Sequence, residues 1–339
     1  MKSLSLLPIV ALLMAASSFS TAQTYTVTDL GTLPSGTWSV AHGINATGAI
    51  TGGSDNNTNL SNVVVDRNGS LTDLGTLGGN TGVGNDINAS GQIAGYSTNA
   101  SRTYRAFISN GSTLMDIGDL GGGSAVAYGI NDLGQVVGSA VTADLNNHPF
   151  LYSSGQMMDL GTLGAPKGVN VWNSAQGINN SGTIVGTSYN ARGDFRGFLW
   201  SNGAMTQMGT LGGDWSQAYA INNKGQVTGI AYLKNNAAAH AFITLANGTL
   251  KDLGLFAGKF STTWGFGIND SGVVVGQSTF QGTYHAFVYI SGKIKDLNRL
   301  IPAKSGWVLL EADSINNAGQ IVGTGMHNGQ EHAFLLTPH

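Results

Sequence analysis

Apolar and β-branched residues occur along this chain in short runs, separated by turns rich in Asn, Gly and Ser. Residues 217–253 illustrate the pattern, with the runs Gln217–Ile221, Gln226–Ala231, Ala241–Leu245 and Thr249–Leu253. Runs of this length and composition, bounded by Gly-containing turns, are typical of antiparallel β-strands. We therefore predict a unit of four short strands joined by tight turns.

This four-strand unit repeats. Its clearest marker is the motif Ile-Asn-x-x-Gly, whose Asn occurs seven times, at Asn45, Asn88, Asn131, Asn179, Asn222, Asn269 and Asn316. Successive copies are separated by 43, 43, 48, 43, 47 and 47 residues, which is about the length of one four-stranded propeller blade. The Asn is expected to cap its own turn, and the Gly to adopt a positive φ.

The order of the runs predicts how the ring closes. A strand-like run at Tyr25–Leu30, ending in Asp-Leu-Gly, precedes the first unit, and the last unit ends at its third run, His332–Thr337. A closed ring in which Tyr25–Leu30 supplies the missing outer strand leaves neither edge unpaired. We predict an all-β fold, a seven-bladed β-propeller of four-stranded blades closed by the N-terminal strand, with residues 23–339 as one domain. Small residues four positions before each Asn, such as Ala41 and Gly84, mark the run leading into Ile-Asn as innermost.

A basic residue followed by a small residue and Phe marks the third run, and Asp-Leu-Gly or a variant marks the fourth. Across the intervening hairpin the two motifs are 11 or 12 residues apart, which predicts cross-strand pairs. The pairs are Arg105–Asp116, His148–Asp159, Arg196–Gln207, His240–Asp252, His285–Asp296 and, across the closure, His332–Asp29. We interpret them as structural and predict no metal and no cofactor, because residues spaced one blade apart cannot meet at one ion.

Composition narrows the function. The net charge of −3 and the scattered 15 Lys and Arg argue against nucleic-acid binding. The absence of Cys excludes disulfides and thiolate metal sites. Residues 1–22 combine Lys2, an apolar stretch from Leu4 to Ala16 and the small residues before Ala22, which predicts a signal peptide cleaved near Ala22. We expect a secreted protein, extracellular or periplasmic, monomeric and without a membrane span.

The motifs His-Ala-Phe, Ile-Asn-x-x-Gly-Gln-x-Val-Gly and Asp-Leu-Gly-Thr-Leu-Gly-Gly together resemble those of the HAF family of bacterial extracellular repeat proteins. The resemblance covers residues 24–337 and implies export and a bacterial source, but no catalytic residues. This sequence departs from the pattern at Asn62-Val63-Val64, a degenerate copy of the third-run motif, and at Gln207, which replaces Asp.

Aromatic residues gather in the connections predicted on one face of the ring. The Trp residues between an outermost strand and the next innermost strand are Trp38, Trp172, Trp215, Trp264 and Trp307, and the loops between second and third strands carry Tyr104, Tyr189 and Tyr284. Aromatic planes among polar groups suit sugar rings, so we consider these residues a candidate binding face. The alternative is that the Trp side chains pack between blades.

A second candidate set lies three residues before each Asn, at a position that is polar in some units and aromatic in others: His42, Asn85, Tyr128, Gln176, Tyr219, Phe266 and Asp313. These side chains either form a pocket at the channel mouth or pack against the next blade. We count His42, Tyr128 and Tyr219 among the candidate binding residues.

The function expected from these features is a secreted, non-enzymatic binding or scaffold propeller whose partner is an extracellular polysaccharide or a cell-surface glycan. One alternative is a polysaccharide lyase or glycoside hydrolase acting at the channel mouth. For a lyase, the candidates are His42, Tyr128, Tyr219 and His327 as the base and Arg192 as the residue that neutralises a uronate. Another is a structural surface or adhesion protein. The sequence assigns no catalytic residue.

Overall fold

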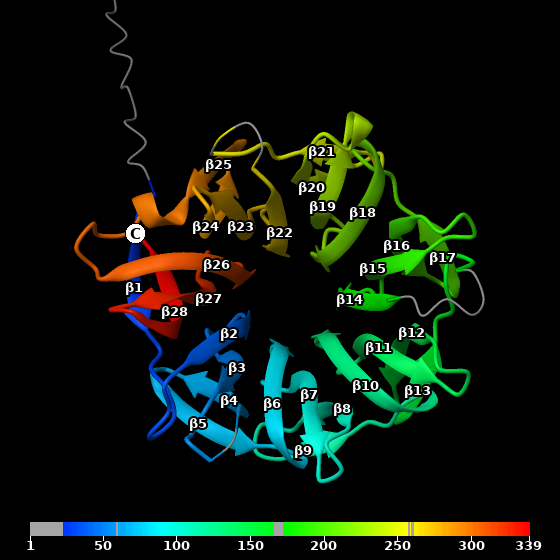
Figure 1. Cartoon of the computed structure of the whole chain (residues 1–339), viewed down its shortest axis with the longest axis horizontal. Coiled ribbons are helices and arrows are strands. Elements are labelled where there is room, and N and C mark those ends of the chain that lie inside the picture. The colour runs from blue at the N-terminus through cyan, green and yellow to red at the C-terminus, as the bar shows by residue number, and fades with distance from the viewer. Residues whose placement is uncertain (1–22, 59, 166–171, 257, 259–260) are drawn as a thin grey trace, which may run out of the picture.

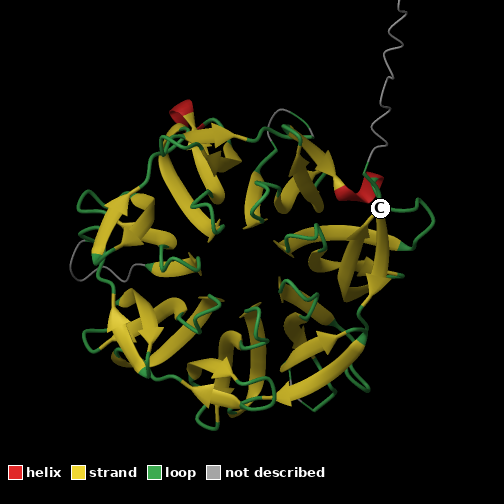
Figure 2. Ribbon diagram, turned by 180° about the vertical axis from the view of Figure 1, so that it is seen from behind, coloured by secondary structure: helices red, strands yellow, loops and turns green. Residues whose placement is uncertain are grey.

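The computed structural model describes residues 23–58, 60–165, 172–256, 258 and 261–339. The predicted signal peptide, residues 1–22, lies outside the described residues. Seven four-stranded antiparallel sheets surround a central axis (Figure 1), which confirms the predicted seven-bladed propeller. Figure 2 shows the same ring from behind, with the innermost strand of each blade beside the axis.

Each blade follows the order of its runs in the sequence. Blade 1 contains β2 (Ser39–Ile44), β3 (Ile50–Ser54), β4 (Asn62–Arg67) and β5 (Ser70–Gly75); blade 2 contains β6 (Gly78–Ile87), β7 (Ile93–Asn99), β8 (Tyr104–Ser109) and β9 (Leu114–Asp116). Blade 3 contains β10 (Gly121–Ile130), β11 (Val136–Thr142), β12 (Asn147–Ser153) and β13 (Gln156–Asp159); blade 4 contains β14 (Ser174–Ile178), β15 (Ile184–Tyr189), β16 (Phe195–Ser201) and β17 (Ala204–Gln207). Blade 5 contains β18 (Gly212–Ile221), β19 (Val227–Leu233), β20 (Ala239–Thr244) and β21 (Leu250–Asp252), with the short 3-10 helix η1 (Lys234–Asn236) between β19 and β20. Blade 6 contains β22 (Thr263–Ile268), β23 (Val274–Phe280), β24 (Thr283–Ile290) and β25 (Lys293–Asp296), followed by η2 (Leu297–Arg299).

Blade 7 is assembled from both ends of the described chain. Strands β26 (Trp307–Ile315), β27 (Ile321–His327) and β28 (Gln330–Pro338) are completed by β1 (Tyr25–Asp29), in the order β1-β28-β27-β26. The register runs from Tyr25 opposite Pro338 to Asp29 opposite Phe334. This arrangement confirms the predicted closure by the N-terminal strand.

The core lies within and between the blades. The Phe of the third-run motif is fully buried in six blades, as Phe107, Phe150, Phe198, Phe242, Phe287 and Phe334. Phe107 packs with Ile87 and Ile93 of its own blade and with Val63 and Val65 of the preceding blade. Burial of each such ring contributes roughly 1.5–3 kcal/mol, so this repeated position stabilises each blade and its contact with the next.

The motif Asn forms a ring that the sequence analysis did not predict. Its Oδ1 caps its own turn, as predicted, but its Nδ2 also donates to the backbone carbonyl of the equivalent Asn one blade further. The seven bonds are Asn45 to Asn88, Asn88 to Asn131, Asn131 to Asn179, Asn179 to Asn222, Asn222 to Asn269, Asn269 to Asn316 and Asn316 back to Asn45, at 2.9–3.2 Å. A closed circle of buried amide hydrogen bonds therefore joins every blade to the next.

Candidate functional site at the channel mouth

Every innermost strand carries a β-bulge at the same place. In blade 1, Ala41 pairs with Gly52 and Gly43 pairs with Thr51, so that His42 is the extra residue. The same count makes the bulged residues of the other blades Asn85, Tyr128, Gln176, Tyr219, Phe266 and Asp313. These are the residues of the mixed polar and aromatic set. A bulge re-aims a side chain, and here it directs one side chain of each blade toward the axis.

Glycine on the second strand makes room for this bulge. In all seven blades, the inner-strand residue that precedes the bulge pairs with a Gly of the second strand. Examples are Gly52, which lies opposite Ala41, and Gly276, which lies opposite Gly265. A Cβ added at Gly276 would lie 1.8 Å from the carbonyl oxygen of Trp264. The Gly of the motif Val-Gly is thus required by the close approach of the inner strand.

The bulged residues line a cavity of about 270 Å³ at one end of the channel. The strand register places this end on the face that carries the loops between second and third strands and the connections between blades, because Ser39 at the start of β2 pairs with Ser54 at the end of β3. The predicted channel-mouth residues His42, Tyr128 and Tyr219 are therefore brought together. Packing against the next blade also occurs, since Asn85 Nδ2 donates to the carbonyl of Ala127 at 2.7 Å.

Titratable side chains line this cavity or lie close to it. His42 Nδ1 lies 3.7 Å from Asp313 Oδ1, while the buried Asp313 Oδ2 has no hydrogen-bond partner among the described residues. Burial and the nearby charge of Asp313 together raise the pKa of Glu311 to about 7, against the opposing effect of His42. Burial also raises the pKa of Asp86, which lines the cavity, to about 6. Burial lowers the pKa of His42, but Asp313 and Glu311 outweigh it and the net shift is upward.

Aromatic side chains also line the mouth, beside Asn85 and Gln176, and they lead outward from it. Tyr219 and Phe266 meet edge to face with centroids 5.5 Å apart. Tyr128 lines both the channel-mouth cavity and an adjoining groove of about 570 Å³, which it shares with Tyr96, Tyr104 and Trp172. Trp172 is 72% exposed and Tyr104 is 48% exposed, so this groove opens to solvent. We call the cavity and the groove together the mouth site.

The other predicted aromatic residues do not join the mouth site. Trp215 stacks on Phe195 and contacts Tyr232, and Phe195 also contacts Tyr189. Trp264 meets Tyr284 edge to face, and Trp307 stacks on His327. Trp38 is half-buried, and its backbone N–H donates to Asp55. Of the five loop Trp residues only Trp172 is exposed, so most of the predicted aromatic face is occupied by contacts within the protein.

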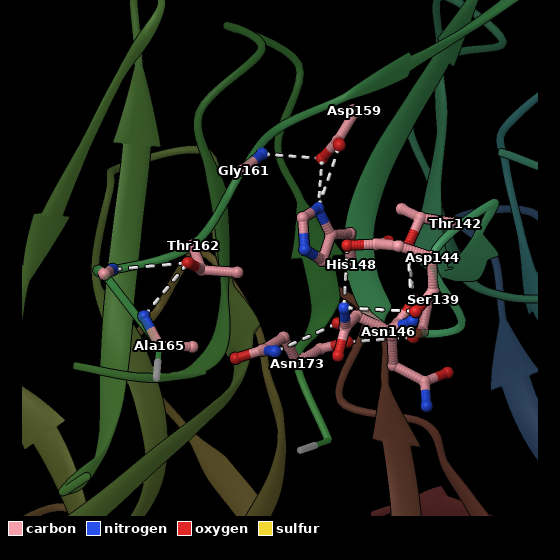
Figure 3. Close-up of polar contacts among 12 residues, drawn as sticks. Ser139, Thr142, Asp144, Asn146, His148, Asp159, Gly161, Thr162, Ala165 and Asn173 are labelled. Atoms are coloured by element: carbon pink, nitrogen blue, oxygen red, sulfur yellow. Dashed lines mark hydrogen bonds and ion pairs between the residues drawn. The ribbon is translucent and has the colours of Figure 1, made fainter. Parts of the chain in front are cut away.

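The repeated basic residues lie in the body of the blades, as predicted. His148 Nδ1 approaches both carboxylate oxygens of Asp159, at 3.0 and 2.8 Å (Figure 3). Equivalent pairs join Arg105 with Asp116, His240 with Asp252, His285 with Asp296 and His332 with Asp29. The degenerate third-run motif of blade 1 forms an equivalent cross-strand pair, because Asn62 Nδ2 donates to both carboxylate oxygens of Asp73, at 2.9 and 2.7 Å.

One predicted pair is wrong. Arg196 contacts Asp194 at 3.3 Å instead of Gln207, and Gln207 accepts a hydrogen bond from Asn190 Nδ2. A neutral amide attracts a guanidinium less than a carboxylate does, so Arg196 turns to the nearby Asp194.

The opposite end of the channel is lined by the Asn ring and encloses about 240 Å³. The Asn side chains there are already hydrogen-bonded between blades and to their own turns. This end therefore offers few free polar groups, and the mouth site is the better candidate for ligand binding. Among the residues described, no helix has the length and apolar character needed to cross a membrane.

Comparison with known proteins gives structural likeness only. No protein-family model matches the sequence, and no curated protein sequence matches it. Among solved structures, a puromycin-hydrolysing peptidase of Mycobacterium tuberculosis is similar over 87% of this chain and 52% of its own, with 12% identity and a TM-score of 0.56. A puromycin hydrolase matches over 85% and 50%, with 12% identity and a TM-score of 0.55. An acylaminoacyl peptidase of Pyrococcus horikoshii matches over 92% and 53%, with 12% identity and a TM-score of 0.54.

These neighbours correct the expected function. The sequence suggested a non-enzymatic, glycan-binding scaffold, whereas the similar propellers are parts of peptidases. This chain spans about half the length of each of them. At 12% identity the likeness shows the fold alone. The rings of Trp215, Trp264 and Trp307 contact other rings of the protein, and the sugar-binding role of the loop Trp residues stays a prediction.

Proposed function

We propose that the mouth site recognises a small organic ligand that carries a protonated amine and an aromatic group, the chemistry of an aromatic amino acid amide or a short peptide. The observation that carries the proposal is the incompletely paired carboxylate of Asp313, which lines the same cavity as aromatic side chains. Asp313 has one oxygen 3.7 Å from His42 and the other without a partner among the described residues. A carboxylate in this state attracts a cation more strongly than one that is fully paired.

The aromatic side chains fit the rest of such a ligand. Tyr219 and Phe266 line the same cavity as Asp313, and an aromatic ring face can contact an ammonium group. Tyr128 connects the cavity to the groove of Tyr104 and Trp172, where an aromatic group can stack.

Calorimetry with phenylalaninamide tests the proposal. Phenylalaninamide carries the amine and the ring, whereas N-acetylphenylalaninamide keeps the ring and loses the charge. We expect phenylalaninamide to bind at least about tenfold more tightly, and Asp313→Asn to remove that preference, because a charged hydrogen bond contributes about 1.5–3 kcal/mol. Tyr128→Ala should weaken both ligands and abolish any quenching of Trp172 fluorescence.

His148→Ala is the matched control, because its pair with Asp159 lies in the body of blade 3 and not at the mouth. It should leave the affinity unchanged. Equal affinity for the two ligands, or binding that survives Asp313→Asn unaltered in a folded protein, contradicts the proposal.

We also propose that the protein is exported with residues 1–22 as a cleaved signal peptide, in keeping with the resemblance of its repeats to the extracellular HAF family. The support is the sequence of residues 1–22, with Lys2, the apolar stretch and the small residues before Ala22. Mass spectrometry of the protein from a culture that expresses the full chain should find a mature N-terminus at Gln23. An intact N-terminus in a cytosolic fraction contradicts it.

A further inference from the structure

Blade 7 differs from the other blades in having two histidines at one carboxylate. His332 Nδ1 is 3.0 Å from both oxygens of Asp29, as the repeat predicts, but His327 Nδ1 also lies 2.8 Å from Asp29 Oδ2. The ligand atoms of the three side chains all lie within 4.8 Å of one another, which holds for no other group of three or more His, Asp and Glu side chains in the described ranges. The second histidine is thus an addition to the structural pair.

The spacing of these three groups suits a metal ion. A metal at about 2.0–2.1 Å from each ligand atom holds neighbouring ligand atoms roughly 2.9–3.4 Å apart, and both nitrogens lie 2.8–3.0 Å from Asp29 Oδ2. All three side chains keep partial exposure, at 30%, 24% and 15% for Asp29, His327 and His332, which leaves room for water ligands.

Surrounding residues hold the second histidine in place. The ring of Trp307 stacks on that of His327 with centroids 4.6 Å apart and planes 1° apart. Asn328 Nδ2 lies 3.2 Å from His327 Nε2, on the side of the ring away from Asp29. A rotation of this amide by 180° would present its oxygen to an Nε2–H, the arrangement that orients a histidine bound to a metal through Nδ1. Gly31 N–H donates to Asp29 Oδ1 at 2.8 Å and fixes the carboxylate.

We propose that Asp29, His327 and His332 form a binding site for one divalent transition metal ion, with zinc, cobalt and nickel as the ions that two imidazoles and a carboxylate suit. Asp29 ends β1, whereas His327 and His332 belong to β27 and β28. The ion therefore joins the N-terminal strand to the last blade at the point where the ring closes. The site is independent of the mouth site, because none of its three residues lines that cavity or groove.

The test is metal titration of the whole chain, purified without a polyhistidine tag. We expect one Zn²⁺ per chain by calorimetry, and with Co²⁺ a visible absorption band from coordinated nitrogen. Zinc at about 100 times its Kd should raise Tm by about 4 °C, since a ligand that binds only the folded state stabilises it in proportion to the logarithm of its concentration. His327→Phe removes one imidazole ligand and should therefore abolish the cobalt band and the shift in Tm. Phe is chosen because blade 6 has Phe280 at the equivalent position of its second strand.

Two further variants keep the result interpretable. His327→Gln removes the imidazole ligand while retaining a polar side chain, and it should also lose metal binding. It replaces His327→Phe in the test if the Phe variant folds poorly. His285→Ala removes the single histidine of the pair with Asp296 in blade 6 and should leave stoichiometry and Tm shift intact. Absence of stoichiometric binding by the parent chain, or binding unaffected by both His327 variants, overturns the proposal.

Discussion

The circle of Asn side chains makes a quantitative prediction. Asn269 is buried, and its Nδ2 donates to the carbonyl of Asn316 at 3.1 Å. Its Oδ1 accepts from the backbone N–H groups of Ser271 and Val273 at 3.0 and 3.1 Å. Asn269→Ala removes all three bonds. The Asn316 carbonyl keeps its bond from Gly319 N–H, so no acceptor is left without a partner.

At about 1 kcal/mol for each buried hydrogen bond, the loss is about 3 kcal/mol. With an unfolding entropy of roughly 2.1 cal/mol/K per residue over ~315 residues, this corresponds to a fall in Tm of about 4–5 °C. Thermal unfolding followed by circular dichroism or calorimetry measures it. Asn247→Ala is the control, because Asn247 is exposed and caps only its own hairpin through Thr249. Its Tm should fall by about 1 °C or less.

Asn269→Asp separates the two roles of the side chain. The carboxylate keeps an acceptor for Ser271 and Val273 but sets a negative oxygen against the Asn316 carbonyl. At neutral pH we expect a loss of at least the size seen for Asn269→Ala. The penalty should shrink as pH falls toward ~4, where a protonated carboxyl can donate again. A Tm for Asn269→Ala no lower than that of the Asn247→Ala control would refute the view that the circle stabilises the ring.

Three further outcomes follow from the structure. The pKa of Glu311 is about 7 in the folded protein and 4.5 ordinarily, so the folded state binds the proton more tightly and stability falls as pH rises from 4.5 through 7. Glu311→Gln lacks this proton, so its Tm should rise relative to that of the parent as pH is raised from 5 to 8. A difference in Tm that stays constant with pH contradicts this. Gly276→Ala should abolish soluble expression or lower Tm by far more than Gly209→Ala, since a Cβ at Gly209 meets nothing within 4 Å. Tyr25→Ala, at a ring only 2% exposed, should cost about 3–5 kcal/mol in denaturant unfolding, and a loss below 1 kcal/mol would show that β1 adds little to blade 7.

Features that depend on spacing within one repeat could be predicted from the sequence. The four strands, the closure by Tyr25–Leu30 and the pairs such as His148–Asp159 all follow from residues fewer than about 50 positions apart, or from the order of the motifs. Arg196 escaped the rule because a stronger partner, Asp194, lies two residues away. The repeat predicts the partner that a residue has in most blades. It does not show whether a nearby side chain in one blade, such as Asp194, binds that residue more strongly.

Features that join neighbouring repeats could not be predicted in the same way. Turn capping already accounts for the Asn of Ile-Asn-x-x-Gly, so nothing in the sequence required its Nδ2 to reach the next blade. A bulge is defined by the register of two strands, and the run around His42 looks like any other strand. The sequence did carry one signal of the bulge. The position three residues before the motif Asn is polar in some blades and aromatic in others, from His42 in the first blade to Asp313 in the last. The second histidine of blade 7 left a similar trace, since β23 of blade 6 ends in Phe280 where β27 ends in His327.

The pairing of β1 with β28 also sets the order in which the molecule can form. The strand that is synthesised first among the described residues meets the strand that is synthesised last, with Thr26 and His339 in contact across 313 positions of sequence. Six blades can complete their own hairpins as they emerge, because each needs only neighbours in the chain. Blade 7 cannot form until β28 has been synthesised. Because the pairing of β1 with β28 closes a loop of more than 300 residues, we expect it to be the slowest step in assembling the ring. Until then β1 and β28 expose unpaired edges, so the interval before closure is when the chain is most open to association with other copies of itself.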